Sequence, residues 1–280
     1  MSLAALPDRA LLAVTGADAE DFLQGLITTD LGALTVDEVR PGALLTPQGK
    51  ILFAFLISRI DGGFRLDTTA DQAPALLKRL TLYKLRAAVT LAQLAPTPVG
   101  VSAEPRPGAL RDVRFETAGT PLFRLYGEDA AGDAAAYDAH RIALGIAEPG
   151  ADYALQDTFP HDVLLDKNGG LSFRKGCYVG QEVVSRMQHR GTARRRVVTV
   201  EAESPLPTSG TELTAGGKTI GTLGSVLGRR GLAIVRVDKV GDALATGLPV
   251  LAGELPVTLA LPAWTGLSFP TDSADEAQGG

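Results

Sequence analysis

The hydrophobic pattern of this chain changes near Arg194, and the change limits the folds that the chain can adopt. Upstream, apolar stretches with the two-residue period of strands alternate with stretches of helical period. Downstream, the apolar runs are short, β-rich and separated by Gly and Pro; they cover 196–201, 219–226, 232–237 and 255–261. The first pattern predicts an α+β layer, and the second predicts a small antiparallel barrel or sandwich.

The first hundred residues predict a module of ferredoxin-like style. Strands are expected at 10–14, 43–46, 51–60, 64–68 and 87–94. Helices are expected after Asp18, whose side chain suits an N-cap, and over 71–85. Helices packed against several strands form the two layers of an α+β module.

The length of 280 residues exceeds the usual size of one hydrophobic core. Proline is frequent at 95–108, which predicts a connection between modules. We therefore expect an α+β module over 1–95, a second α+β module over 96–192 and a C-terminal β-barrel over 193–266. The stretch 267–280 has little to bury and is expected to be disordered.

Cysteine usage and hydropathy bear on the compartment. The chain holds one cysteine, which excludes an internal disulfide and suits a reducing environment. Its longest apolar run, 51–57, is too short to cross a bilayer, which takes about 20 residues. The first residues lack the basic region of a secretory signal peptide. We expect a cytoplasmic protein that does not contact a membrane.

Two common kinds of site are not indicated. The cysteine and the widely spaced His140, His161 and His189 lack ligand spacing, so the sequence predicts no metal site built by this chain alone. The Gly-Gly-Lys-Thr run at 216–219 imitates the end of a phosphate-binding loop, but Glu212 stands where that motif requires glycine. The run is therefore predicted to be a hairpin turn.

A cationic segment contrasts with the net charge of −5. Seven basic residues and one acid lie between Arg174 and Arg196. Such a segment favours an anionic small ligand or a confined contact with a partner or RNA. A nucleic-acid-coating protein would be basic overall, so direct nucleic-acid binding is not the favoured reading. A solvated charged face is the simpler alternative.

The cysteine lies inside this segment, in the stretch 175–182. Gly180 can cap a helix that begins at the next residue, with Glu182 in its first turn. Cys177 then lies just before a helix N-terminus and near Lys175, and both features favour the thiolate over the thiol. The flanking glycines let a ligand or partner approach the backbone. The alternative is that Cys177 is a small buried hydrophobe, as free cysteines commonly are.

The eight residues at 175–182, Lys-Gly-Cys-Tyr-Val-Gly-Gln-Glu, resemble the K-G-C-[FY]-x-G-Q-E signature of the YgfZ-type folate-binding proteins. That family belongs to the superfamily of the aminomethyltransferase (T-protein) of glycine cleavage. The similarity extends over most of the chain, at 16–19, 22–25, 28–30, 45–50, 83–86, 141–146 and 173–191. A C-terminal barrel fits the same family.

The resemblance implies ferredoxin-like modules of T-protein type around a central folate pocket. It implies a folate-binding accessory protein for the assembly or repair of iron–sulfur clusters in client enzymes, including tRNA-modifying ones. The implied cofactor is tetrahydrofolate or a derivative. The implied partners are iron–sulfur assembly proteins or client iron–sulfur enzymes, and the implied state is a monomer.

Site roles follow from the resemblance residue by residue. Cys177 takes the place of the functional thiol of the motif, and Lys175 accompanies it as a candidate for the chemistry. The residues taken as folate contacts are Tyr178, Gln181, Glu182, Arg186 and Arg190. The two arginines are assigned to the glutamate tail of folate, because guanidinium groups match carboxylates in geometry.

Two positions depart from the aminomethyltransferase pattern. Phe53 and Ala54 stand where those enzymes place a catalytic aspartate, and Ala143 stands where they place a glutamate for the pterin ring. Without these carboxylates the pterin and the transferring amine lack acceptors, so a conventional aminomethyltransferase is not expected. A tetrahydrofolate-dependent one-carbon transferase remains an alternative. An interaction module that docks RNA or an acidic protein through Arg194 and Arg195 is another.

Overall fold

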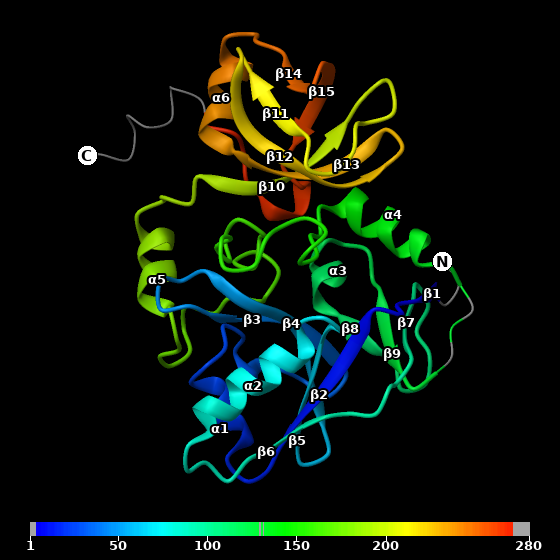
Figure 1. Ribbon diagram of the computed structural model, residues 1–280, viewed down its shortest axis with the longest axis vertical. Coiled ribbons are helices and arrows are strands. Elements are labelled where there is room, and N and C mark those ends of the chain that lie inside the picture. The colour runs from blue at the N-terminus through cyan, green and yellow to red at the C-terminus, as the bar shows by residue number, and fades with distance from the viewer. Residues whose placement is uncertain (1–3, 129, 131, 271–280) are drawn as a thin grey trace. The chain divides into compact units, whose positions relative to one another are not determined.

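The computed structural model describes residues 4–128, 130 and 132–270 (Figure 1). The chain packs as two compact units, and each of them consists of several segments. Unit 1 comprises Met1–Tyr137, Leu155–Pro160 and Leu165–Arg186. Unit 2 comprises Asp138–Ala154, His161–Leu164 and Met187–Gly280. The predicted module bounds, 1–95, 96–192 and 193–266, stay a prediction.

Within its described residues, unit 1 is built on a nine-stranded sheet with the order β1-β7-β9-β8-β3-β4-β5-β2-β6. The strands are β1 (Ala4–Ala5), β2 (Arg9–Thr15), β3 (Glu38–Leu45), β4 (Ile51–Ile60), β5 (Gly63–Thr69), β6 (Thr90–Gln93), β7 (Val99–Ser102), β8 (Leu110–Asp112) and β9 (Phe123–Tyr126). Strands β3 and β8 pair in parallel, and the other neighbours pair antiparallel. The sheet is therefore mixed.

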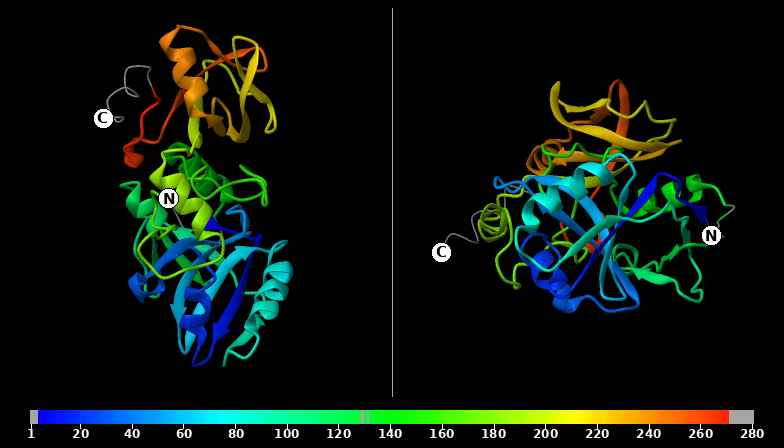
Figure 2. Two further views of the ribbon diagram at one scale, coloured as in Figure 1. Left: turned by 90° about the vertical axis from the view of Figure 1, so that its left-hand side faces the viewer. Right: turned by 60° about the horizontal axis from the view of Figure 1, so that its bottom comes forward.

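The helices of unit 1 cover this sheet. They are α1 (Ala19–Gln24), α2 (Ala73–Lys84), α3 (Val113–Thr117) and the 3₁₀ helix η1 (Leu31–Ala33). Leu23 of α1 and Leu76 and Leu80 of α2 are buried in one cluster with Phe64 and Leu66 of β5. The four-residue spacing in α2 brings both leucines to the face that meets the strands, and Figure 2 shows that helix lying against the sheet.

Two further helices, α4 (Ala134–Leu144) and α5 (Gln181–His189), each begin in unit 1 and end in unit 2. The expected strand at 87–94 is shorter in the structure, because Ala87 and Val89 form backbone turns after α2 before β6 starts. The other expected strands and helices of the first hundred residues are present.

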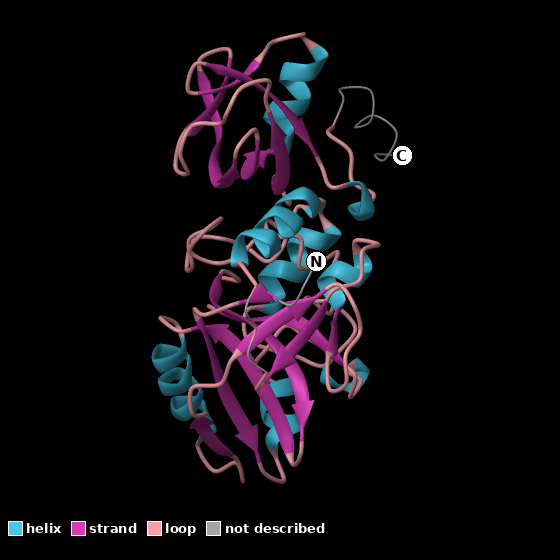
Figure 3. Ribbon diagram, turned by 90° about the vertical axis from the view of Figure 1, so that its right-hand side faces the viewer, coloured by secondary structure: helices cyan, strands magenta, loops and turns pink. Residues whose placement is uncertain are grey.

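Unit 2 contains a closed antiparallel barrel with the strand order β10-β13-β12-β11-β14-β15. Its strands are β10 (Arg195–Glu201), β11 (Glu212–Ala215), β12 (Lys218–Leu227), β13 (Arg230–Arg236), β14 (Val250–Ala252) and β15 (Leu255–Ala260), followed by the 3₁₀ helix η2 (Ala263–Thr265). Helix α6 (Val237–Ala245) packs on it through Val240 and Ala243 (Figure 3). Gly216 and Gly217 have φ of +54° and +75° and connect β11 to β12, which confirms the predicted hairpin turn.

Two further predictions concern a disordered C-terminal stretch and the lack of a membrane span. Of the stretch predicted to be disordered, 271–280 lies outside the described residues, whereas Phe269 packs against the barrel core. Among the helices that the structure describes, none combines the length and the apolar character needed to span a membrane.

Candidate functional site

The motif cysteine lies in an irregular segment, residues 172–179, which we call the cysteine loop. The loop enters beside the loop that follows α1: the Ser172 amide donates to the Thr28 carbonyl at 2.9 Å. The Thr28 hydroxyl in turn donates to the Gly170 carbonyl at 2.6 Å, and it is buried. A threonine about 140 residues away therefore fixes the start of the cysteine loop.

The buried Lys175 side chain holds the middle of the cysteine loop through hydrogen bonds. Only 9% of its surface is exposed. Its Nζ donates to the Ile27 carbonyl at 2.7 Å and to the Thr29 carbonyl at 2.8 Å. Burial lowers the pKa of this amine to about 8, and the nearby Asp30 carboxylate opposes that shift. The amine that the sequence suggested as a partner of the thiol is thus held by backbone oxygens.

Tyr178 closes the far end of the cysteine loop. Its hydroxyl donates to the Ser172 carbonyl at 3.1 Å, and its ring centroid is 5.2 Å from the Lys175 Nζ. Burial raises the pKa of the Tyr178 phenol. The Ser172 hydroxyl also accepts from the Lys175 amide at 3.2 Å. The two ends of the loop are therefore hydrogen-bonded to each other, and its start is also hydrogen-bonded to Thr28.

Cys177 is exposed at the tip of this tied loop. The interpretation of Cys177 as a small buried hydrophobe is therefore excluded. A Cβ added at the neighbouring Gly176 would meet no atom within 4 Å, and the φ of Gly176 lies outside the left-handed region. The fold itself does not need a glycine at 176. The loop thus presents a thiol and an open stretch of backbone on a hydrogen-bonded base.

Gly180, on the other side of Cys177 in the motif, is required by the fold, unlike Gly176. Gly180, which precedes α5 as predicted, has φ of +78°, and a Cβ there would lie 2.5 Å from the Thr46 carbonyl oxygen. Gly49 has φ of +81°, and a Cβ there would lie 3.0 Å from the Val183 side chain. These two glycines let the start of α5 pack against the turn between β3 and β4. The packing sets the direction in which α5 leaves the cysteine loop.

The residues taken as folate contacts fall into different environments. Gln181 is half-buried, and Glu182 and Arg186 form an exposed i,i+4 ion pair of 2.6 Å. Arg190 is exposed and belongs to unit 2. Tyr178 has its hydroxyl already bonded within the cysteine loop. Of this set, Glu182 and Arg186 are brought together, and they can contact a ligand from solvent.

The cationic segment is not one solvated face. Lys175 and Arg196 are buried, and Arg196 Nη1 donates to the His161 carbonyl at 2.6 Å. Arg195 Nε lies 3.7 Å from Asp162 Oδ2. The exposed members are Arg174, Arg186, Arg190 and Arg194. Part of the segment therefore stabilises the fold.

The structure also describes the positions where aminomethyltransferases carry acids. Phe53 is buried in the core of unit 1. The Ala54 amide donates to Gln72 Oε1 at 3.3 Å, and its carbonyl accepts from the Thr68 hydroxyl at 2.9 Å. Neutral groups thus occupy this neighbourhood. No group of three or more His, Cys, Asp or Glu side chains that would hold a metal ion occurs in the described part of the chain.

Sequence reasoning missed the residues that build the base of the cysteine loop. Thr28, Thr29 and Ser172 received no role, although the Thr-Thr-Asp run at 28–30 was one of the segments that carried the family resemblance. That run was the available signal. Its partners lie more than 140 residues away, so no local pattern reveals the contact.

Comparison with solved structures defines the class of fold. The chain is similar to the glycine cleavage system aminomethyltransferase T from Bartonella henselae, with a TM-score of 0.69 and 19% sequence identity over 93% of this chain and 85% of that one. Residues 194–267 match the family described as CAF17, C-terminal beta-barrel domain. The protein has an aminomethyltransferase-like α+β fold with a small antiparallel barrel at its C-terminal end, so the predicted fold class is confirmed.

Curated relatives then define the family. The mitochondrial iron–sulfur cluster assembly factor IBA57 of Homo sapiens is 32% identical over 282 residues, which cover 85% of this chain and 78% of the relative. The homolog from Pyricularia oryzae is 30% identical over 302 residues, with 89% and 75% covered. The chain belongs to the IBA57 family of iron–sulfur cluster assembly factors.

The prediction of a cytoplasmic location is wrong. The relatives from Homo sapiens, Pyricularia oryzae and Mycosarcoma maydis are named as mitochondrial proteins. The prediction rested on a single cysteine, on the lack of an apolar run of membrane length and on the lack of the basic region of a secretory signal peptide. Those features suit any reducing compartment, so they do not select the cytoplasm.

Proposed function

We propose that this protein serves the assembly or repair of iron–sulfur clusters in client enzymes, with Cys177 as its functional thiol. Membership of the IBA57 family supports the role in cluster assembly. The observation that carries the assignment to Cys177 is the contrast within the motif. Lys175 and Tyr178 are buried and bonded, while the thiol between them is exposed. Such a thiol can contact a cluster, a sulfur species or the thiol of a partner.

The proposal is tested by expressing Cys177→Ser in a strain that lacks its own IBA57-family protein. The variant should accumulate and unfold like wild type, because the side chain is exposed. It should fail to restore the activity of iron–sulfur enzymes, which is measured in extracts alongside an enzyme that carries no cluster. Full restoration by Cys177→Ser would remove the thiol from the mechanism.

The client enzymes belong to the same proposal. Within the superfamily, the YgfZ-like motif at 175–182 supports clients that modify tRNA. The complementation strain should then regain thiolated tRNA nucleosides together with iron–sulfur enzyme activity, and mass spectrometry of the nucleosides measures this. Recovery of the enzymes without recovery of the nucleosides would exclude tRNA-modifying clients.

We further propose that the protein binds tetrahydrofolate or a derivative. The chemistry of the exposed pair fits the glutamate tail, since Arg186 uses one terminal nitrogen for Glu182 and keeps further donors. Tyr178 is buried and its hydroxyl donates within the loop, so it supports the loop more than it offers a folate contact. A bound folate would supply one-carbon chemistry, and this chain's part would be to bind and orient it.

Titration with reduced folates tests this second step. The Arg186→Gln variant should weaken binding several-fold, because it removes the partner of a carboxylate. The matched control is Arg106→Gln, at another exposed, ion-paired arginine of unit 1. Equal affinity of wild type and Arg186→Gln would exclude Arg186 from the site. Absence of binding to wild type would end the folate proposal while leaving the cysteine proposal intact.

A further inference from the structure

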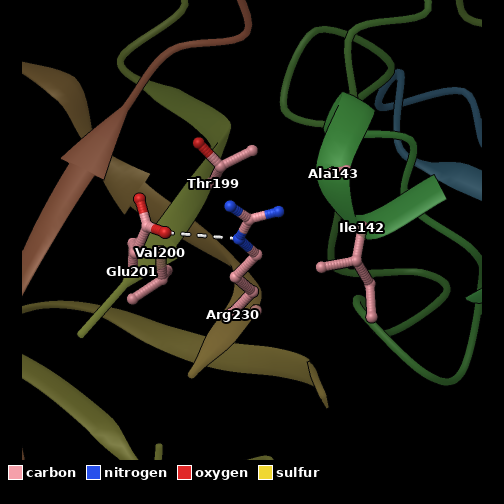
Figure 4. A pocket seen from close by; sticks show the side chains of 7 residues that line it. Ile142, Ala143, Thr199, Val200, Glu201 and Arg230 are labelled. Atoms are coloured by element: carbon pink, nitrogen blue, oxygen red, sulfur yellow. Dashed lines mark hydrogen bonds and ion pairs between the residues drawn. The ribbon is translucent and has the colours of Figure 1, made fainter. Parts of the chain in front are cut away.

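A hollow within unit 2 lies between the barrel and the last turn of α4. Its volume is about 230 Å³. The residues that line it are Ile142, Ala143, Thr199, Val200, Glu201, Arg230 and Gly231. Figure 4 shows the Arg230 side chain standing between the strand that carries Thr199 and Glu201 and the helix that carries Ile142 and Ala143. Its lining residues all belong to unit 2, and the cysteine loop belongs to unit 1.

Two small residues line this space. Ala143 is exposed on the last turn of α4 and reaches only a short way into it. Gly231 is buried, and a Cβ there would lie 2.9 Å from the Ser225 carbonyl oxygen and 3.1 Å from the Leu206 side chain. The barrel therefore requires glycine at 231. Ile142, almost fully buried, gives the hollow an apolar wall, whereas the Val200 side chain belongs to the core of the barrel.

An ion pair forms the polar side of the hollow. Arg230 Nε donates to Glu201 Oε1 at 3.2 Å, and the two side chains are 66% and 64% exposed. A pair so exposed contributes only about 0–1 kcal/mol, so an incoming ligand can share or replace it at little cost. Figure 4 shows the terminal nitrogens of Arg230 turned toward Thr199 and α4, on the side away from the Glu201 contact. They offer a fork of donors to a carboxylate.

We propose that this hollow binds a free α-amino acid with an apolar side chain. The ligand carboxylate pairs with the terminal nitrogens of Arg230, and the ligand ammonium pairs with Glu201. The Thr199 hydroxyl donates to the Ala260 carbonyl at 3.2 Å and keeps lone pairs that can accept from the ammonium. The side chain of the ligand lies against Ile142 and fills the space beside Ala143.

Charge balance selects this ligand class. The site holds one positive and one negative group, so a zwitterion leaves both paired and the total unchanged. A simple carboxylate would be left near Glu201, and a simple amine would be left near Arg230; like charges at such distances are repelled. The two charges of an α-amino acid are separated by one carbon, so one small ligand carries a partner for each of these neighbouring side chains.

Size points the same way. Pockets for drug-sized ligands and cofactors enclose about 300–1,000 Å³. A hollow of about 230 Å³ lies below that range and has room for an amino acid. This inference goes beyond the proposed role in cluster assembly and does not depend on it.

The test is binding of L-leucine to the full-length protein, followed by ligand-observed NMR. N-acetyl-L-leucine lacks the ammonium and L-leucinamide lacks the carboxylate. Each should bind about three- to fivefold more weakly than leucine, because each loses one solvent-exposed charge pair. Absence of leucine binding up to about 10 mM would overturn the proposal, and so would equal binding of N-acetyl-L-leucine.

Variants locate the binding in the hollow. Arg230→Gln should weaken leucine binding about three- to fivefold. Ala143→Leu, at an exposed position that tolerates the larger side chain, should abolish the binding by filling the hollow. The matched control is Arg229→Gln, at the neighbouring exposed arginine that does not line it. An equal loss of affinity in Arg229→Gln and Arg230→Gln would mean that the loss reflects the overall charge of the protein, and it would overturn the site. Unchanged leucine binding in Ala143→Leu would also overturn it.

Discussion

The two glycines of the motif at 175–182 look alike in sequence and differ in physical role. Gly180 has a left-handed backbone with a carbonyl oxygen where a Cβ would go, whereas Gly176 has neither constraint. The first is required by the fold. The second leaves open backbone beside the exposed thiol, as expected where another molecule comes close.

This difference predicts that substitution by alanine destabilises the protein at position 180 and leaves its stability nearly unchanged at position 176. Gly180→Ala should lower the free energy of unfolding by about 2 kcal/mol or more, because the left-handed backbone alone costs about 1–2 kcal/mol and the Thr46 carbonyl must also move. Gly176→Ala should stay within about 0.5 kcal/mol of wild type. Urea unfolding of both variants measures this. Equal stability of the two variants would contradict the assignment.

Lys175 should give the protein a distinctive pH dependence. Its pKa is about 8 in the folded protein and ordinarily 10.5, so above pH 8 the folded state loses this proton before the unfolded state does. Unfolding then takes up a proton, and stability from this group rises with pH across that window. The neutral amine keeps two N–H groups for the two carbonyls that it contacts.

The measurement is the free energy of unfolding from about pH 8 to about pH 10, compared between wild type and Lys175→Met. Wild type should gain stability relative to the variant as the pH rises. Lys78→Met, at an exposed lysine, serves as the matched control and should show no such relative change. A flat difference between wild type and Lys175→Met would mean that the amine is not desolvated.

At the scale of elements, unit 2 depends on a buried network that joins α4 to β12. Arg141 Nη1 donates to Asp152 Oδ2 at 2.6 Å, and the Ser225 amide donates to Asp152 Oδ1 at 2.7 Å. Arg141 Nη2 donates to the Ser225 hydroxyl at 2.7 Å. Gly224 lies so close that a Cβ there would be 2.6 Å from Asp152 Oδ1. One carboxylate thus connects segments more than 70 residues apart.

Removal of this carboxylate should destabilise the protein strongly. Asp152→Ala leaves the Arg141 guanidinium with fewer partners in a buried site, and loss of one member of a buried ion pair costs about 3–5 kcal/mol. The control is Asp242→Ala, which breaks the exposed pair with Lys239 and should cost less than about 1 kcal/mol. Chemical denaturation compares them. A loss below about 1 kcal/mol in Asp152→Ala would show that Arg141 finds other partners.

Sequence predicted the elements better than it predicted these contacts, for a physical reason. The two-residue and 3.6-residue periods in the first hundred residues are local, and so are the glycines that turn the chain between β11 and β12. The partners of Arg141 and of Lys175 are set by how distant segments pack. Within the candidate site, the helix start at Gln181 and the Glu182–Arg186 pair were predictable. The inward direction of Lys175 was not.

For the whole molecule, the central question is whether the exposed thiol works with other molecules rather than within this chain. The residues around the thiol favour a role with other molecules. The lysine nearest in sequence is held by the carbonyls of Ile27 and Thr29, and the neighbouring tyrosine by Ser172. The base of the cysteine loop is therefore complete without Cys177. The chain belongs to a family of iron–sulfur cluster assembly factors, and the proposed action on client enzymes requires an accessible contact point.

Alkylation of the native protein tests this directly. Iodoacetamide should modify wild type at Cys177 without denaturant, at a rate within about tenfold of the same protein in urea, because the side chain is exposed. The alkylated protein should keep its urea midpoint, since no described contact of the fold uses the thiol. It should no longer support iron–sulfur enzyme activity when added to extracts of the deletion strain. Cys177→Ser controls for modification elsewhere. If alkylation shifted the urea midpoint, the thiol would belong to the fold; if modified protein remained active, clients would be served through another part of the molecule.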